Sequence, residues 1–232
     1  MKKMTALLLA ALMVLSMAAC ASKPAEESDL AYIQDKGTLV VGITDFAPMD
    51  YQNESGEWIG FDADLAKAFA DSLGVKVEFV EIVWDNKVLE LDSKTIDCVW
   101  NGMTLTSEVT SAMACSNAYC NNAQVVIVPA DKAADYQTVE SVKDLTFAAE
   151  AGSAGEAELN ALGYSVTPVS AQSDALMEVA AGTPDAVVID SHGCRHGRRG
   201  HGLCEPHLHL RPQLRRVRRR LPQGFRPCPE AE

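Results

Sequence analysis

From Thr38 onward, short apolar runs alternate with segments that carry a helical stripe, and this alternation limits the folds open to the chain. Thr38 to Ile43 is rich in β-branched residues and almost entirely apolar, as in a strand covered on both faces. A helix follows, with Asp62 as its expected cap and Gly74 at its end. Three further elements are expected: a strand over Val75–Ile82, a helix near Asn86–Leu91 and a strand near Ile96–Trp100. Together they form a βαβαβ unit, which favours a largely parallel sheet.

The same rhythm returns in the second half of the chain. The expected elements are a strand over Gln124–Val128, a short helical turn over Ser141–Leu145, a strand over Thr146–Ala149, a helix over Ser153–Leu162, a strand over Ser165–Val169, a helix over Ser173–Ala181 and a strand over Ala186–Ile189 ending at Asp190. We therefore predict an α/β protein with one lobe over 38–123, a second over 124–191, and a ligand cleft between them.

The N-terminus is typical of an export signal. Lys2 and Lys3 precede an apolar run that ends at Ala19, and about fourteen apolar residues are too few to span a bilayer. The residues before Cys20 are similar to a lipobox, whose cysteine becomes the lipidated first residue of the mature protein. We expect a lipoprotein signal peptide over 1–20 and a polar tether over 21–37. An ordinary signal peptide with an incidental cysteine is the alternative.

Charge divides the chain sharply near residue 191. Residues 1–191 hold ten lysines, no arginine and 29 acidic residues, a net charge of −19, whereas residues 192–232 hold ten arginines, no lysine and three acidic residues, a net charge of +7. All five histidines lie in the second part. The overall net charge of −12 therefore describes neither part.

The last 41 residues, 192–232, have the composition of a shifted reading frame. Out-of-frame reading of a gene rich in Ala, Gly and Asp codons yields Arg, Pro, His, Cys and Gly, the residues that dominate this segment. We expect a disordered tail, with the second lobe truncated or frameshifted after about Ser191 and left incomplete. Scattered Cys and His residues and the arginine run near Arg215 suggest zinc or nucleic acid, but neither spacing is a recognised motif, and we expect neither partner.

Five segments carry a family resemblance. They are GITDFAPMDY (Gly42–Tyr51), IGFDADLAKAFADSLGVKVEFV (Ile59–Val80), SKTIDCVWNGMTLTSE (Ser93–Glu108), and the pair EAGSAGE and DAVVIDS. In this order they resemble the family 3 periplasmic solute-binding proteins of ABC importers. The resemblance implies the type II periplasmic-binding-protein fold, in which two lobes close over an amino acid or related polar solute. It also implies ABC permease subunits as partners, a monomer, and no cofactor or metal.

The resemblance also assigns the ligand-binding residues. Phe46 and Trp84 would enclose the aliphatic part of the solute, and Asp190 would pair with its α-amino group. Ser153 and Ala154 would supply N–H groups at a helix N-terminus. The remaining expected ligand contacts are Asp45, Tyr51, Asn101, Gly102 and Thr104. From the residues alone, Asp45 can equally cap its own turn, and Phe46 and Trp84 can equally be core aromatics.

One position departs from the family pattern. Val109 stands where the family usually has an arginine that clamps the ligand carboxylate. A lysine, a helix N-terminus or backbone N–H groups must replace that arginine, or the ligand lacks the carboxylate. With Asp45, Asp50 and Asp190 expected near the cleft, we predict a cationic or zwitterionic solute in preference to a dicarboxylate.

The sequence thus predicts an exported solute-binding protein, in the periplasm or lipid-anchored to the outer face of the cytoplasmic membrane, that converts nothing chemically. One rival is an enzyme on the same fold, similar to cyclohexadienyl dehydratase, although no acid–base pair of defined spacing stands out. Two further rivals are a sensor module and a non-functional frameshifted product. A disulfide between Cys115 and Cys120 is compatible with export.

Overall fold

The computed structural model describes residues 28–192 and 203–204, which fall into two units that divide between Gly37 and Thr38. The described part of the first unit is helix α2 (Asp29–Lys36). Ser28 caps it by accepting from the Ala31 N–H at 3.1 Å, and Gly37 ends it at a φ of 73°. The segment 21–37, expected to be a polar tether, thus contains a helix that Ser28 caps at its start and Gly37 ends. The signal peptide and Cys20 lie outside the described residues.

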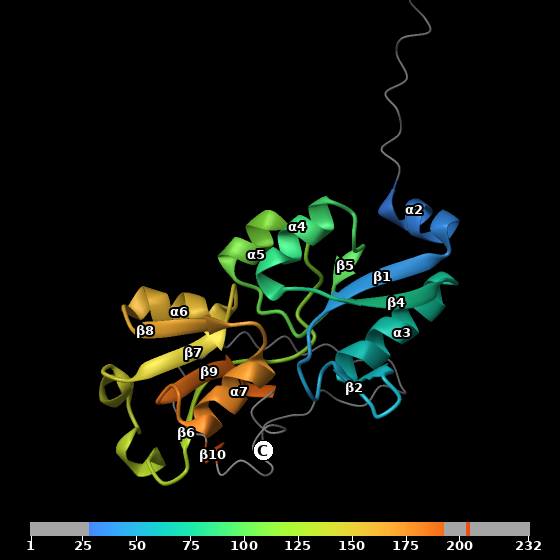
Figure 1. Ribbon diagram of the computed structural model, residues 1–232. Coiled ribbons are helices and arrows are strands. Elements are labelled where there is room, and N and C mark those ends of the chain that lie inside the picture. Colours follow the sequence, from blue (N-terminus) through green and yellow to red (C-terminus); the bar gives the residue numbers. More distant parts are fainter. Residues whose placement is uncertain (1–27, 193–202, 205–232) are drawn as a thin grey trace, which may run out of the picture. The chain divides into compact units, whose positions relative to one another are not determined.

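The first sheet is parallel, as the sequence predicts, with strand order β4-β1-β5 (Figure 1). Its strands are β1 (Thr38–Ile43), β4 (Lys76–Glu81) and β5 (Cys98–Val99). Gly42 lies in β1 at a point where a Cβ atom would stand 2.5 Å from Ile96 Cδ1. Only glycine fits this position without displacing the isoleucine.

Helix α3 (Phe61–Leu73) begins one residue before Asp62, so the prediction that Asp62 caps it is wrong. Gly60 is the capping position, and the N–H groups of Phe61 and Asp62 donate to the Pro48 and Met49 carbonyls at 3.1 and 2.9 Å. The preceding loop therefore satisfies the free N–H groups of the helix, and no side chain is needed. Asp62 itself is buried.

Short elements connect the first sheet to the rest of the lobe. They are β2 (Tyr51–Gln52), β3 (Trp58–Ile59), the 3₁₀ turn η2 (Trp84–Asn86), α4 (Lys87–Asp92) and α5 (Ser107–Ala112). Helix α5 has no sequence-predicted counterpart. It starts where the Thr106 hydroxyl accepts from the Val109 N–H at 3.2 Å.

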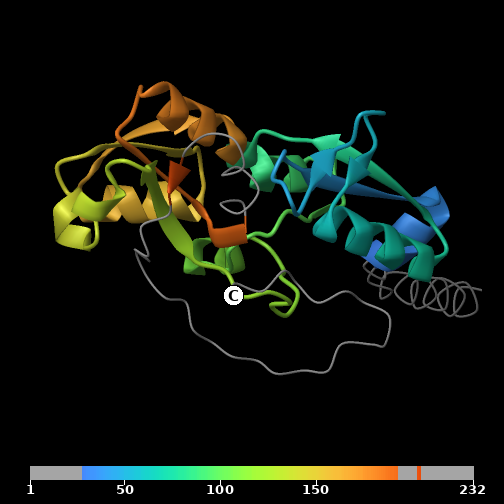
Figure 2. The ribbon, with the colours of Figure 1, turned by 90° about the horizontal axis from the view of Figure 1, so that it is seen from below.

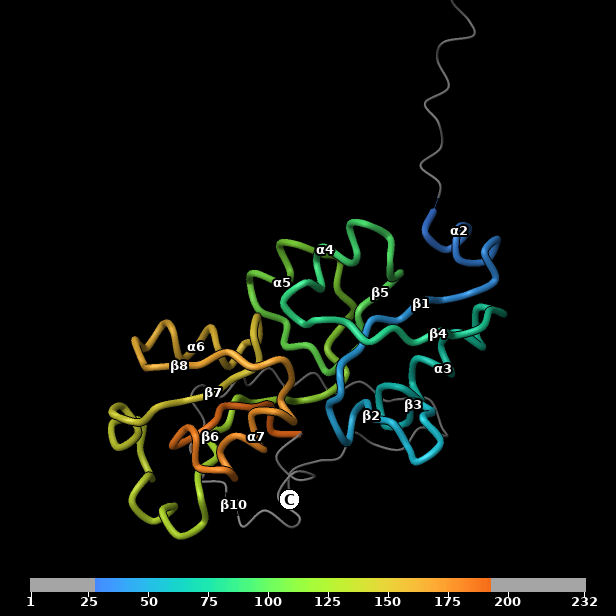
Figure 3. Tube along the Cα trace, in the orientation of Figure 1, coloured from blue at the N-terminus to red at the C-terminus, as the bar shows by residue number. Residues whose placement is uncertain are grey.

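The chain passes to a second sheet between Val99 and Gln124 (Figure 3). The strand order is β10-β6-β9-β7-β8, with β7 parallel to β8 and β9 but β6 antiparallel to β9. The elements of this part are β6 (Gln124–Pro129), η3 (Ala133–Asp135), η4 (Val139–Val142), β7 (Thr146–Glu150), α6 (Ala154–Leu162), β8 (Ser165–Val169), α7 (Gln172–Ala181), β9 (Ala186–Asp190) and β10 (Leu203–Cys204).

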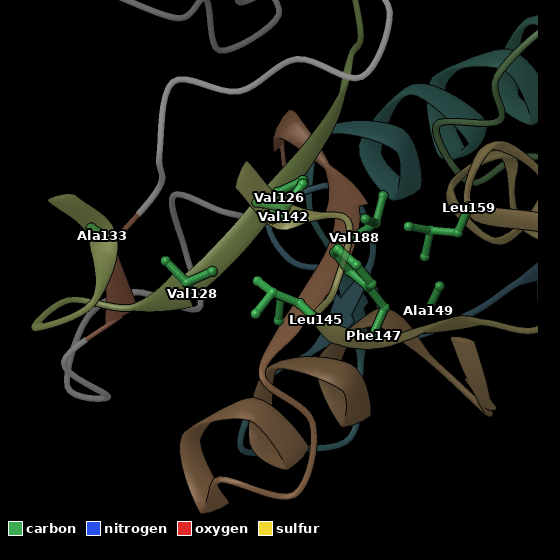
Figure 4. Packing of buried hydrophobic residues seen from close by; sticks show 10 residues of the cluster. Val126, Val128, Ala133, Val142, Leu145, Phe147, Ala149, Leu159 and Val188 are labelled. Atoms are coloured by element: carbon green, nitrogen blue, oxygen red, sulfur yellow. The ribbon is translucent and has the colours of Figure 1, made fainter. Parts of the chain in front are cut away.

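Helices α6 and α7 cover opposite faces of this sheet (Figures 1 and 2). On one face Leu159 packs with Phe147 and Val188 (Figure 4). On the other, Leu176 packs with Ile127 and Ile189. Because both faces are covered, the strands are continuous apolar runs, and this is why β6 and β9 are evident from the sequence.

Three residues of the predicted 192–232 tail are described. His192 follows β9, is buried, and its Nε2 atom lies 2.6 Å from the Asn121 carbonyl oxygen. Leu203 and Cys204 form β10, which pairs antiparallel with β6. The rest of the predicted tail lies outside the described residues.

Candidate functional site

A cleft of about 600 Å³ is lined by residues from both lobes. The first lobe contributes η2, α4, α5 and the segment after β5. The second contributes the start of β6, the ends of β7 and β9, most of α6 and the start of α7. The volume falls in the range of pockets that enclose small ligands. The carboxyl ends of strands meet here, as expected for an open α/β sheet.

Asp190, the last residue of β9, is held by amide side chains. Its Oδ1 accepts from Asn122 Nδ2 and, at 2.6 Å, from Gln124 Nε2. Its Oδ2 accepts from Gln172 Nε2 at 2.5 Å, while the Asp190 N–H donates to Gln172 Oε1 at 2.8 Å. Three amides from two segments, around the start of β6 and the start of α7, therefore fix this carboxyl group in one orientation within the cleft.

The predicted contacts after β5 are anchored to neighbouring segments. Asn101 Oδ1 accepts from the Thr44 N–H at 2.9 Å, and its Nδ2 donates to Thr44 Oγ1 at 2.6 Å. The Thr104 hydroxyl lies 3.5 Å from Asp190 Oδ1 and accepts from Asn122 Nδ2 at 3.1 Å. Thr104 and Asp190 thus come together, although 86 residues separate them.

The N-terminus of α6 is already engaged. Ser153 Oγ accepts from the Glu156 N–H at 3.1 Å, and the Ser153 N–H donates to the Glu150 carbonyl at 3.1 Å. Glu156 Oε2 accepts from the Gly152 N–H at 2.7 Å. Ser153 and Ala154 line the cleft as expected, but a ligand anion at this helix would face the Glu156 carboxylate.

Lys87 and Glu150 line the cleft and were not identified from the sequence. The Lys87 ammonium donates to the Trp84 and Gly152 carbonyls at 3.2 and 3.0 Å and lies 5.0 Å from the centre of the Trp84 ring. Burial lowers the pKa of Lys87, and Asp85, Glu108 and Glu150 oppose that effect. Lys87 could have been predicted from Val109, which stands where the family usually has an arginine. The lack of that arginine suggests that another cation of the cleft binds the ligand carboxylate.

Glu150 is the most deeply buried acid of the cleft, with 2% of its surface exposed. Within the described residues its Oε1 atom has no hydrogen-bond partner. Burial raises the pKa of Glu150 to about 8, Asp190 adds to the rise, and Gln172 and Lys87 act against it. The carboxyl group therefore carries a proton over much of the neutral range.

The cleft is strongly acidic. Among its described lining residues, Lys87 is the one cation. The acidic lining residues are Asp85, Glu108, Glu150, Glu156, Glu158 and Asp190. Val109 lines the cleft but is largely buried on α5. This charge distribution favours a ligand with at least one positive group.

Of the ten predicted ligand contacts, seven line the cleft: Trp84, Asn101, Gly102, Thr104, Ser153, Ala154 and Asp190. Asp45, Phe46 and Tyr51 are not among its lining residues. Phe46 is buried in the first lobe, where its ring would stand 3.0 Å from a Cβ atom on Gly102. It therefore supports the Gly102 backbone from behind, while Asp45 is exposed.

Two further buried carboxyl groups, Asp50 and Asp62, lie outside the cleft lining. Burial, with the neighbouring Asp62 charge, raises the pKa of Asp50 to about 9. Burial also raises the pKa of Asp62 to about 6, against the lowering effect of Tyr119, the Gly102 amide and Trp100. Asp50 was expected near the cleft as a charge, and its position in the first-lobe interior makes it a neutral acid instead.

The Cys115–Cys120 disulfide that export would allow is absent. Cys115 is a free, exposed thiol, whereas Cys120 is disulfide-bonded. The five-residue spacing was compatible with a bond but did not require one.

Comparison with known proteins supplies the class. The arginine-binding extracellular protein ArtP of Bacillus subtilis is 28% identical over 195 residues, which cover 82% of this chain and 73% of ArtP. Cyclohexadienyl dehydratase of Pseudomonas aeruginosa is 32% identical over 136 residues, or 58% of this chain, and the match spans about half, 51%, of that enzyme. The solved structure of a Gly52Ala mutant of arginine-bound ArgBP from T. maritima superposes with a TM-score of 0.73, at 33% identity, over 76% of this chain and 84% of that one.

The two lobes and the cleft define a solute-binding protein of the type II periplasmic-binding-protein fold. The chain belongs to the bacterial extracellular solute-binding proteins, family 3, whose family model matches residues 39–219. The predicted fold class and family are thereby confirmed.

Proposed function

We propose that this protein is the extracytoplasmic solute-binding component of an ABC importer and binds an amino acid or a related small polar solute in its cleft. The observation that carries the proposal is the Asp190 carboxyl group, fixed by three amide side chains beside Thr104 in a cleft of about 600 Å³. A fixed carboxylate is suited to an α-ammonium group.

Each lining residue has a role in this proposal. Asp190 and Thr104 hold the α-ammonium group, and the Trp84 ring covers the aliphatic part of the ligand. Lys87 binds the ligand carboxylate in place of the family arginine, whose position Val109 occupies. It is the one cation among the described lining residues of the cleft. Contacts to both lobes give the ligand a higher affinity for the closed arrangement, which shifts the population of lobes toward closure.

The cellular setting is also part of the proposal. Lipidation at Cys20 would hold the protein at the outer face of the cytoplasmic membrane, where the closed form meets ABC permease subunits. No helix among residues 28–192 and 203–204 has the length and apolar character needed to cross a bilayer.

A thermal-shift screen of the twenty amino acids and of related small polar solutes on the full chain, followed by calorimetry, tests the proposal. At least one of these solutes should raise the unfolding midpoint and bind with one-to-one stoichiometry. If none of them binds, the proposal is wrong.

A second candidate is an enzyme similar to cyclohexadienyl dehydratase. The observation in its favour is Glu150, a carboxyl group that keeps a proton near neutral pH and can act as a general acid. Incubation with a cyclohexadienyl acid, with the aromatic product measured by absorbance, decides between them. Product formation that Glu150→Gln abolishes would establish the enzyme, and unchanged acid would exclude this reaction.

A further inference from the structure

Glu150 combines three properties that the solute-binding role does not explain. It ends β7 inside the cleft, only 2% of its surface is exposed, and its Oε1 atom has no hydrogen-bond partner among the described residues. A buried carboxyl oxygen without a partner is costly in the empty protein. Such a group is suited to receive a donor that arrives from outside.

The groups around Glu150 do not supply that donor. Asp190 on β9 and Asp174 on α7 are acidic, and both oppose ionisation of Glu150. Gln172 on α7 hydrogen-bonds to Glu150 and also donates to Asp190 at 2.5 Å, but Glu150 Oε1 still has no partner among the described residues. Lys87 on α4 directs its hydrogen bonds to the Trp84 and Gly152 carbonyls. The missing positive charge is therefore left to the ligand.

On the basis of the proposed solute-binding function, we propose that Glu150 accepts the side-chain cation of a basic amino acid and loses its proton to solvent as that ligand binds. The O–H bond of the Glu150 carboxyl group breaks, the proton leaves to water, and the carboxylate pairs with the guanidinium or ammonium group. No oxidation or reduction is involved. A neutral amino acid leaves the carboxyl group protonated.

The charge of the lining supports a basic ligand. Besides Glu150, five acidic residues and a single lysine are among the described lining residues, so the lining has an excess of negative charge. A zwitterion adds no net positive charge to it, whereas a basic amino acid adds one. Glu150 and Asp190 lie close enough for each charge to affect the other. A ligand with two separated cationic groups satisfies both carboxyl groups at once.

Calorimetry with L-arginine and L-citrulline separates the charge from the shape of the ligand, because the two are nearly isosteric. The full chain is titrated between pH 6 and 8 in two buffers that differ in ionisation enthalpy. We expect arginine binding near pH 6 to release close to one proton and citrulline binding to release none. Well below the Glu150 pKa, the arginine affinity should rise about tenfold per pH unit.

Two variants complete the experiment. Glu150→Gln keeps the shape but removes the ionisable group, so it should abolish proton release and reduce the preference for arginine over citrulline at least tenfold. Glu78→Gln makes the same charge change at an exposed position of β4, outside the cleft lining, and should alter neither.

The outcomes distinguish this inference from the function on which it rests. If no amino acid binds the wild-type chain, the role of Glu150 is wrong, and if no related polar solute binds either, the solute-binding function is wrong as well. If amino acids bind but arginine binding releases no proton from the wild type, or Glu150→Gln keeps the arginine preference, the role of Glu150 is wrong and the solute-binding function stands.

Discussion

The Lys87 ammonium donates to the Gly152 carbonyl oxygen at 3.0 Å, a bond that joins residues 65 positions apart. It links α4 of the first lobe to the loop between β7 and α6 of the second. Gly152 permits the close approach, because it has a φ of 70° and a Cβ atom there would stand 2.6 Å from Asp85 Oδ1. One edge of the cleft is thus connected without a ligand.

Lys87→Met should weaken this connection. The variant keeps an apolar stem near Trp84 but leaves the Gly152 carbonyl without its donor. We expect a loss of about 1–3 kcal/mol in the free energy of unfolding, as for hydrogen bonds that involve a charged group. Urea denaturation measures it. Lys143→Met, which breaks the exposed ion pair of Lys143 with Glu140, should cost less than about 1 kcal/mol, and an equal loss in both variants would contradict the role of Lys87.

Asp190→Asn should remove amino-acid binding. The substituted amide would meet the three amide groups that now donate to the carboxylate, and the partner for the ligand ammonium would be lost. Affinity should fall about 100-fold or more, measured by calorimetry with the amino acid that stabilises the wild type most. Asp131→Asn, at an exposed position outside the cleft lining, should leave affinity within a factor of two. Retained binding in Asp190→Asn would refute the assignment.

The buried pair Asp50 and Asp62 predicts the direction of the pH dependence of stability. Both folded-state pKa values, about 9 and about 6, lie above the ordinary aspartate value of 3.8. The native state therefore retains protons that the unfolded chain has released. Unfolding free energy should fall as pH rises, from about pH 4 to 6 through both groups and on to about pH 9 through Asp50.

Asp50→Asn tests this dependence, since each such group contributes a slope of about 1.4 kcal/mol per pH unit. Between pH 6 and 8 the wild-type slope comes from both Asp50 and Glu150, because the pKa of Glu150 is also raised, to about 8. The variant should therefore lose about half as much stability as the wild type over this range, measured by urea denaturation at several pH values. Asp64→Asn, on the same helix as Asp62 but exposed, should keep the wild-type slope. Equal slopes in wild type and Asp50→Asn would show that Asp50 is already ionised when folded.

Gly42→Ala should destabilise the first lobe, because its Cβ atom would lie 2.5 Å from Ile96 Cδ1. A loss of about 1–3 kcal/mol is expected for overpacking a buried strand. Ile96→Val removes that methyl group, so the double variant should be more stable than the sum of the two single losses predicts. Strict additivity in urea denaturation would show that the isoleucine is not the obstacle.

The strands were predictable where burial on both faces makes them continuous apolar runs, as in β1, β6 and β9. Helix α5 was not, because Ser107–Ala112 has few apolar residues and depends on the Thr106 cap. The prediction that Asp62 caps α3 was wrong because of a tertiary contact. The Pro48 and Met49 carbonyls already accept from the first N–H groups of the helix. A local pattern cannot reveal an acceptor that the preceding loop supplies.

The residues of the candidate site likewise include some that were predictable from the sequence and some that were not. The position of Asp190 and Thr104 in the cleft lining was predictable, because Asp190 ends a strand and Thr104 follows one at the edge where ligand groups gather. Lys87 and Glu150 were not, since their importance comes from neighbours such as Gly152 and Asp190 that only the folded chain brings to them. Phe46 was assigned to the ligand by resemblance, yet its ring lies behind Gly102.

The reciprocal pair of hydrogen bonds between Gln172 and Asp190 has a consequence for how quickly the cleft can act. Gln172 accepts from the Asp190 backbone and donates to its side chain, so the carboxylate loses its rotational freedom when the lobe folds. A solute that reaches it meets a group that is already oriented, and little ordering entropy remains to be lost on capture. The speed of uptake should then depend on diffusion and lobe movement, with no delay while the anchoring side chain finds its place.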